Sequence, residues 1–164
     1  MVMEKAKGVA LRDLFTKPGL QVSLSQKWQI IRDLASAVGY LHSRNICHRD
    51  LTPNNIIVQL KNSPGLEAIP KVTIIDFNIS RRLAEIDFLD TSGTANYRSP
   101  EALLGEPQGL AGDMWSLGAV LFFILSNGKE AFVASHPKLR ELILKSMVDF
   151  SLLKNDQYTI SSEF

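Results

Sequence analysis

A helix that is apolar on nearly every side limits what this chain can fold into. Residues 113–126 predict such a helix, because no polar face interrupts their large apolar side chains. The run consists of Met114, Trp115, Leu117, Val120, Leu121, Phe122, Phe123, Ile124 and Leu125. A helix without a polar face belongs in the middle of a core, and Asn127 with Gly128 is typical of a helix end. We therefore expect residues 113–126 at the centre of the fold.

Length and charge exclude several classes of protein. The chain has 164 residues, enough for one domain that buries roughly 70% of its unfolded surface. Its net charge of +1 argues against a module that binds nucleic acid by neutralising phosphates. Residues 1–8 lack the apolar region of a signal peptide, and residues 117–125 are too few to span a bilayer. The lone Cys47 excludes an internal disulfide and fits a reducing compartment. We expect an intracellular, cytoplasmic protein that binds neither nucleic acid nor a membrane.

Three further helices are predicted from periodicity and caps. Residues 9–15 can form about two turns before Pro18 and Gly19. A longer helix begins after Ser23 or Ser25 and runs to about Ser43. Its apolar face would consist of Trp28, Ile31, Ala35, Val38 and Leu41 or His42. The third begins at Pro137, and its apolar face would consist of Leu139, Leu142, Ile143 and Met147.

Two short strands, residues 56–60 and 72–75, are rich in β-branched side chains. Several turn-forming residues separate them, so we expect an enlarged loop. These residues are Asn62, Pro64, Gly65 and Pro70. Residues 76–97 show little periodicity, which in a compact domain indicates either a functional loop or a disordered one.

Polar motifs follow two of these elements. In the segment His48-Arg49-Asp50-Leu51-Thr52-Pro53-Asn54-Asn55, a carboxylate precedes a carboxamide by five residues. Asp76-Phe77-Asn78 directly follows the second strand. Carboxylate and amide oxygens could take a proton and bind a hard cation. Each residue also has a structural interpretation when taken alone: Asp50 and Asp76 as turn residues, and His48 as a packed, hydrogen-bonded histidine.

Two more motifs stand downstream, Gly93-Thr94-x-x-Tyr97-x-Ser99-Pro100-Glu101 and Asp113-x-Trp115-Ser116-x-Gly118. Taken alone, Glu101 could be an acid at a helix start and Asp113 a helix cap. In this order and spacing, the four motifs resemble the eukaryotic protein kinase catalytic domain, over nearly the whole chain. Pro53 and the stretch 93–97 resemble its serine/threonine branch.

The resemblance implies an α+β fold: a mostly helical large C-terminal lobe with a small β-hairpin at the catalytic loop. Residues 1–8 would be the end of the hinge strand and the hinge. Residues 9–164 would be a partial large lobe, with the catalytic loop at 48–55, the activation segment at 76–101 and the central helix at 113–126. The chain thus resembles a large lobe cut on both sides.

The resemblance also implies a site for ATP, Mg²⁺ and a protein substrate with serine or threonine. Asp50 would accept or orient the proton of the substrate hydroxyl, and Asn55 and Asp76 would hold Mg²⁺. The nucleotide site would consist of the backbones of Glu4 and Ala6 at the adenine edge, Ile57 below the adenine, and Ile75 with Asp76. His48 and Phe77 would align the two lobes.

Regulation is implied at several positions. Thr94 would contact Asp50, and Arg49 could pair bidentately with a phosphate on the activation segment. The usual phosphorylated position falls on Asp90, whose carboxylate supplies about half the charge of a phosphate, with Thr91 and Ser92 as secondary sites. Asp113 would tether the backbone of the catalytic loop. The family's arginine partner for Glu101 would lie beyond this chain.

The sequence departs from the family pattern. Thr52 stands where these kinases carry a lysine that reaches the transferred phosphate, so transfer should be slower. Asn78 replaces a glycine, and asparagine tolerates a positive φ. Ala10 stands near a position where kinases that prefer basic substrates often have an acid.

The segments that grip the phosphates of ATP do not precede residue 1, so we expect transfer only within a complete domain. One alternative is a pseudokinase or a kinase-like interaction module without catalysis. Another is a small-molecule phosphotransferase of kinase-like fold.

Overall fold

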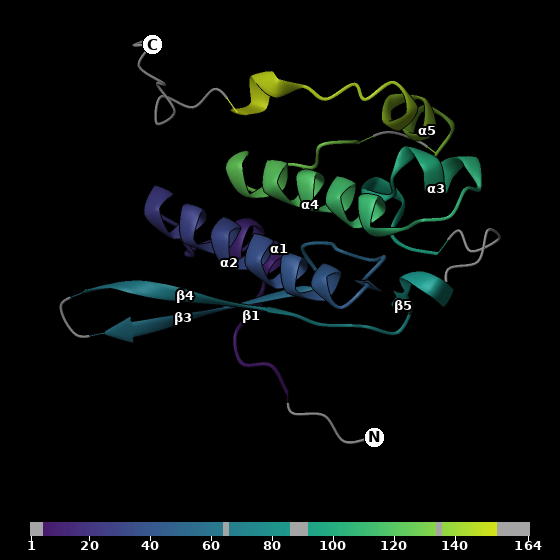
Figure 1. Ribbon diagram of the computed structural model, residues 1–164. Helices are drawn as coiled ribbons and strands as arrows, with labels where there is room; N and C mark the ends of the chain where they lie inside the picture. Colours follow the sequence, from purple (N-terminus) through teal and green to yellow (C-terminus); the bar gives the residue numbers. More distant parts are fainter. Residues whose placement is uncertain (1–4, 64–65, 86–91, 134–135, 154–164) are drawn as a thin grey trace, which may run out of the picture.

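The computed structural model describes residues 5–63, 66–85, 92–133 and 136–153. A small antiparallel sheet and two long helices form successive layers, so the expected α+β class is confirmed (Figure 1). The elements are β1 (Val9–Ala10), α1 (Leu11–Thr16), α2 (Leu24–Ser43), β2 (Ile46–Cys47), β3 (Ile56–Ser63), β4 (Leu66–Ile74), β5 (Arg81–Arg82), η1 (Leu83–Glu85), η2 (Ala95–Tyr97), α3 (Pro100–Leu104), α4 (Leu110–Leu125), α5 (His136–Leu144) and η3 (Phe150–Leu153). None of the described helices is long and apolar enough to cross a membrane.

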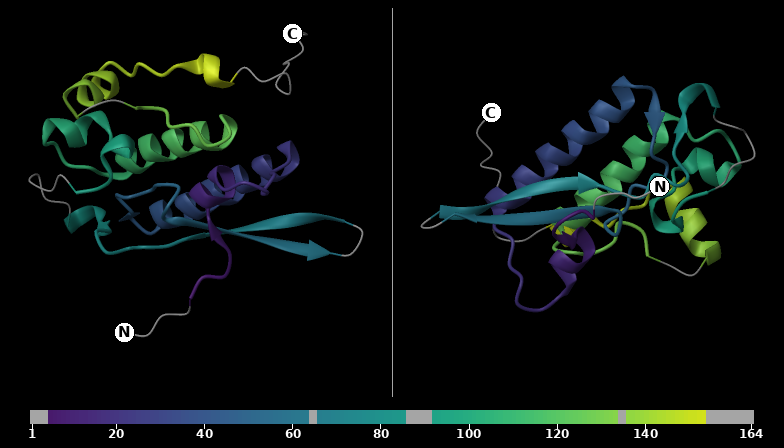
Figure 2. Two further views of the ribbon diagram at one scale, coloured as in Figure 1. Left: turned by 180° about the vertical axis from the view of Figure 1, so that it is seen from behind. Right: turned by 90° about the horizontal axis from the view of Figure 1, so that it is seen from below.

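Helix α4 lies in the core, as its sequence predicts. Val120, Phe123 and Ile124 have no exposed surface, and α2 packs between α4 and the sheet (Figures 1 and 2). The predicted start is wrong, because the helix begins at Leu110 after the N-cap Gly109. Met114 is 53% exposed, so one member of the apolar run faces outward. The end is confirmed: the N–H of Gly128 donates to the carbonyl of Phe123 over 2.8 Å.

Helix α2 has the predicted limits but presents a different face to the core. Ser23 is the N-cap and forms a capping box with Gln26. The buried residues are Gln26, Lys27, Ile30, Leu34 and Val38. Trp28 is 49% exposed, so the predicted face is wrong by about one residue. The shift has a polar cause: Lys27 is buried and donates from Nζ to Oδ1 of Asn127 at the end of α4, 2.6 Å away. A lysine stem can lie in a core when its charged end finds a partner.

The two central strands are longer than predicted. The β3–β4 ladder runs from the pair Ile56–Ile74 to the pair Ser63–Leu66, with an irregularity between Lys61 and Ser63. Most of the expected enlarged loop is therefore strand, and Pro64 and Gly65 lie outside the described residues. Pro70 is accommodated opposite Leu60 because β4 is an edge strand of the order β1-β3-β4.

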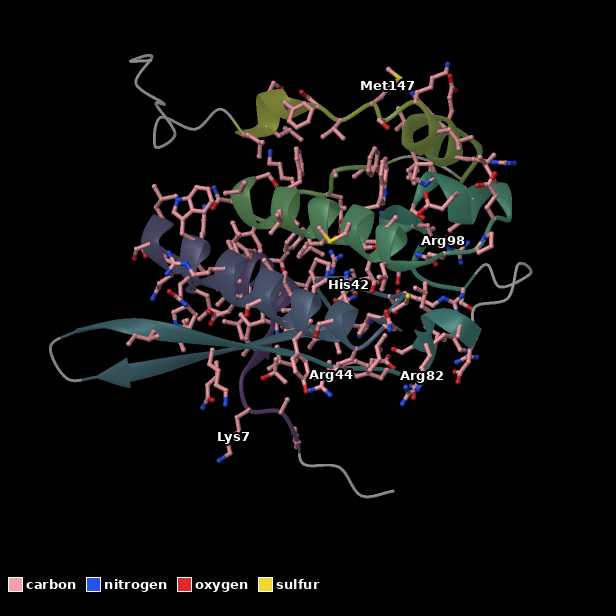
Figure 3. The ribbon with its side chains drawn as sticks, viewed as in Figure 1. Lys7, His42, Arg44, Arg82, Arg98 and Met147 are labelled. Atoms are coloured by element: carbon pink, nitrogen blue, oxygen red, sulfur yellow. The ribbon has the colours of Figure 1, made fainter. Side chains whose placement is uncertain are left out.

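Three other predicted boundaries change. Val9 and Ala10 form strand β1, paired with Val58 and Ile57, so the first helix begins only at Leu11. The segment 76–97 contains β5, which pairs with β2, and two 3-10 turns, so it is not wholly irregular. Helix α5 ends at Leu144, and Met147 lies outside it on the surface (Figure 3).

Candidate active site

The loop 48–55 is anchored to α4 by one buried carboxylate. Asp113 has no exposed surface; its Oδ2 accepts the N–H of His48 at 2.8 Å, and its Oδ1 accepts the N–H of Arg49 at 2.7 Å. Nε2 of His42, in the last turn of α2, lies 3.0 Å from Oδ2 (Figure 3). A charge can be buried when hydrogen bonds satisfy it in this way. Asp113 lies in the first turn of α4 and is not its cap, so the capping interpretation is wrong.

Asp50 is held in one orientation by residues from two segments. Its Oδ1 accepts the N–H of Thr94 at 2.9 Å and the Thr94 hydroxyl at 2.8 Å. Its Oδ2 accepts Nδ2 of Asn55 at 2.8 Å, and the same Nδ2 donates to the Asp50 carbonyl at 2.9 Å. The structure therefore brings together Asp50, Asn55 and Thr94, whose grouping the motifs predicted.

The end of β4 brings Asp76 to the same region, because the N–H of Ile75 donates to the carbonyl of Asn55 over 2.9 Å. Asp76 is exposed, has φ +64°, and accepts the N–H of Asn78 on Oδ1 at 3.4 Å. The left-handed residue of this motif is thus Asp76. Asn78 is not among the described residues with positive φ, so tolerance of such a φ does not account for it.

His48 is a packed residue that joins the loop to β4. The N–H of Asp50 donates to its Nδ1 over 3.3 Å, so Nε2 carries the proton and donates to the carbonyl of Ile75 at 3.0 Å. Phe77 contacts the His48 ring edge to face, with centroids 4.8 Å apart, and remains 44% exposed. These contacts match the structural interpretation of His48.

Arg49 and Gly93 bring the segment 76–101 close to the loop 48–55. Arg49 is buried, has φ +72°, and donates from Nη1 to the carbonyl of Ile79 at 3.2 Å. Gly93 has φ +107°, and an added Cβ would lie 2.7 Å from the carbonyl oxygen of Arg49. Only a residue without a Cβ fits this approach. Asp90 and Thr91 lie outside the described residues, and so does Glu4.

The other residues predicted for the site differ in their burial and in the elements to which they belong. Thr52 is 2% exposed, so its hydroxyl does not reach out from the loop as a lysine would. Ile57 lies between the buried residues Ile56 and Val58, and therefore faces the side of the sheet away from the core. Ile75 and Ala6 are half-buried, and Glu101 lies in the first turn of α3.

The oxygens of this site suit Mg²⁺. The amide nitrogen of Asn55 donates to Asp50, which leaves the amide oxygen of Asn55 for a cation. The Asp76 carboxylate is exposed nearby, in the loop after β4. Mg²⁺ is commonly held by one or two such groups together with waters and phosphates. Within the described residues, no cluster of three or more His, Cys, Asp or Glu side chains could hold a metal by itself.

The motifs did not predict every residue that supports the site. His42 reaches Asp113 across 71 positions, and its only signal was its place beside Leu41 on the predicted helix face. Arg12 donates from its side-chain Nε to Oδ1 of Asn54 at 3.0 Å, and its backbone N–H donates to the carbonyl of Pro53 at 3.0 Å. No spacing rule connects Arg12 with residues this far along the chain.

Comparison with known proteins gives one family and several relatives. The family profile described as "Protein kinase domain" matches residues 1–164. Death-associated protein kinase 2 of Homo sapiens is 32% identical over 127 residues, which cover 77% of this chain and 33% of that protein. Myosin light chain kinase A of Dictyostelium discoideum is 32% identical over 151 residues, covering 92% of this chain and 49% of that protein. Serine/threonine-protein kinase PknB of Mycolicibacterium smegmatis is 35% identical over 142 residues, covering 84% and 21%. The chain thus spans half or less of the length of these relatives.

Proposed function

This chain belongs to the protein kinase family, as its motifs predicted, and we propose that it carries the catalytic loop of a serine/threonine protein kinase. Its reaction would transfer a phosphoryl group from ATP, with Mg²⁺, to a serine or threonine hydroxyl of a protein. The observation that supports this proposal is the Asp50 carboxylate, fixed by Thr94 on one oxygen and by Asn55 on the other.

Asp50 orients the substrate hydroxyl and takes its proton. Its two oxygens keep fixed directions because Thr94 and Asn55 donate to them, so the substrate hydroxyl meets a carboxylate that does not have to reorient. Asn55 and Asp76 would hold Mg²⁺, which would neutralise charge on the phosphates. Residues 1–8 form the hinge side of the nucleotide site, and residues 9–164 are part of the large lobe.

The buried Thr52 supplies no positive charge to the site, which favours slow transfer. Asp90 stands at the position of the family's activating phosphate, and its carboxylate partly replaces that phosphate. Thr52 and Asn78 also keep the alternative open: a kinase-like module that binds partners without transferring phosphate.

The test separates nucleotide binding from transfer. Calorimetry with ATP, with and without Mg²⁺, should show Mg²⁺-dependent binding that Asp76→Asn weakens at least tenfold. In a protein that carries this chain within a complete kinase domain, incorporation of labelled phosphate into a serine- and threonine-containing protein should fall by about 100-fold or more in Asp50→Asn, because a positioned base contributes at least that much. ATP binding by Asp50→Asn should persist.

Asp149→Asn is the matched control, because Asp149 is an exposed carboxylate in the segment after α5. Nucleotide binding without transfer by the unaltered complete domain would favour the interaction module. Transfer that survives Asp50→Asn would refute the role given to Asp50.

A further inference from the structure

Arg12, at the second position of α1, contacts the catalytic loop and a residue that follows α4. Its backbone N–H donates to the carbonyl of Pro53, and its side-chain Nε donates to Oδ1 of Asn54, four residues after Asp50. Its Nη2 donates to Oε1 of Glu130 over 2.5 Å. The guanidinium also lies 5.4 Å from the centre of the Phe123 ring. One side chain therefore joins α1, the loop and the end of α4.

Glu130 links Arg12 to the activation segment. Its second oxygen, Oε2, accepts the hydroxyl of Tyr97, which is buried in η2. Burial raises the pKa of Tyr97, and the hydrogen bond to Glu130 raises it further, so this hydroxyl keeps its proton and donates it. We call Arg12, Glu130 and Tyr97 the clamp.

Tyr97 leads directly to the contact with Asp50. Its N–H donates to the carbonyl of Thr94 over 2.9 Å, and Thr94 donates twice to Oδ1 of Asp50. The carbonyl of Tyr97 is fixed as well, because it accepts the Ser116 hydroxyl at 2.7 Å. A displacement of Tyr97 would therefore move Thr94 relative to Asp50.

The clamp differs from an ordinary surface ion pair in its burial. The Glu130 side chain is 17% exposed, and each of its oxygens has a donor. Loss of either donor leaves a largely buried carboxylate oxygen without a partner, which costs more than loss of an exposed pair. By contrast, the pair Lys17–Asp13 on the same helix is mostly exposed.

We propose that the clamp positions Thr94 on Asp50, by tying the catalytic loop at Asn54 to the activation segment at Tyr97. Arg12, Glu130 and Tyr97 are thus positioning residues, and none of them has to touch a substrate. Their importance for phosphoryl transfer rests on the proposed function. The coupling between the two segments is a property of the chain and is measured without nucleotide.

Residue-resolved amide hydrogen exchange on the full chain tests the clamp. Tyr97→Phe removes only the hydroxyl and keeps the shape of the ring, and it should speed exchange of the Thr94 amide by about tenfold. Arg12→Ala should have at least the same effect, whereas Arg12→Lys keeps the charge beside Glu130 and should restore part of the protection. Amides of the β3–β4 ladder and of α2 should keep their rates. The control Lys17→Ala should leave all of these rates unchanged.

The double variant Arg12→Ala with Tyr97→Phe shows whether the clamp acts as a unit. If it does, Thr94 exchanges no faster in the double variant than in Arg12→Ala alone. Unchanged exchange of Thr94 in Tyr97→Phe, additive effects in the double variant, or an equal rise at every amide would each overturn the proposal. Failure to bind ATP would count against the proposed function alone, because no nucleotide enters this experiment.

Discussion

Replacement of Asp113 by asparagine should destabilise the chain strongly although the two side chains have the same shape. The carboxylate accepts the N–H of His48 on one oxygen and the N–H of Arg49 on the other. An amide has one oxygen, so one of these buried N–H groups would face an NH₂ donor. His42 adds little to the cost, because its ring can change tautomer and accept from the new NH₂.

The expected loss in the free energy of unfolding follows from the hydrogen bond that the amide cannot accept. Loss of a hydrogen bond to a charged acceptor costs about 1.5–3 kcal/mol, and the repulsion of two buried donors brings the total to about 3–4 kcal/mol. That is a large share of the roughly 5–15 kcal/mol that stabilises an ordinary domain. The effect should appear as a lower urea midpoint with an unchanged slope.

Urea unfolding, followed by tryptophan fluorescence, measures the difference from the unaltered chain. The control is Asp13→Asn, because the Asp13 side chain is 39% exposed and forms an ion pair with Lys17 at 2.9 Å. Exposed pairs of this kind contribute about 0.3–0.5 kcal/mol. If Asp113→Asn and Asp13→Asn lowered the free energy of unfolding by similar amounts, Asp113 would not anchor the loop as described.

Two further predictions concern Cys47 and Gly93. Burial, followed by the charge of Asp113, raises the pKa of Cys47 from 9.0 to about 11, so the folded chain keeps a proton that the unfolded chain loses. The free energy of unfolding should therefore fall by about 2–3 kcal/mol between pH 9 and 11, and urea titrations should show this part of the fall missing in Cys47→Ala. Gly93→Ala should cost about 1–3 kcal/mol, because its Cβ would meet the carbonyl of Arg49 at a positive φ. In Gly93→Ala the Thr94 amide should exchange faster. Unchanged exchange would show that the backbone around Gly93 can shift while Thr94 keeps its hydrogen bond to Asp50.

Elements with strong local signals were predictable from the sequence. The N-cap was predicted as Ser23 or Ser25, and the structure selects Ser23. The helix end at Asn127 and Gly128 was predicted from those two neighbouring residues, and the structure has it. The β3–β4 ladder was underestimated because Pro70 is a turn signal in most contexts. Only the sheet order shows that β4 is an edge strand, where proline is tolerated.

The buried face of α2 was mispredicted for a different reason. A periodicity argument ranks side chains by polarity, so it placed Trp28 inside and Lys27 outside. Lys27 can be buried because its ammonium group donates a hydrogen bond to Asn127, at the end of another helix. Partners that distant along the chain leave no mark in a local pattern.

Separation along the chain also decides which parts of the candidate site can be predicted from a local pattern. Asp50 and Asn55 are five residues apart and contact each other, so their spacing carried the prediction. The supports of the loop come from far away: Asp113 is bonded to His48 across 65 positions, and Arg12 to Glu130 across 118. The resemblance implied the support from Asp113, because it covers the motif that contains this residue. The support from Arg12 belongs to no motif and appears only when the fold is known.

The two supports also explain why the loop can keep its shape within this chain. Asp113 fixes the loop just before Asp50, and Arg12 fixes it just after, at Pro53. Thr94 then sets the direction of the carboxylate between them. Together with Asn55 on the other oxygen, these partners account for the orientation of Asp50 within the described residues.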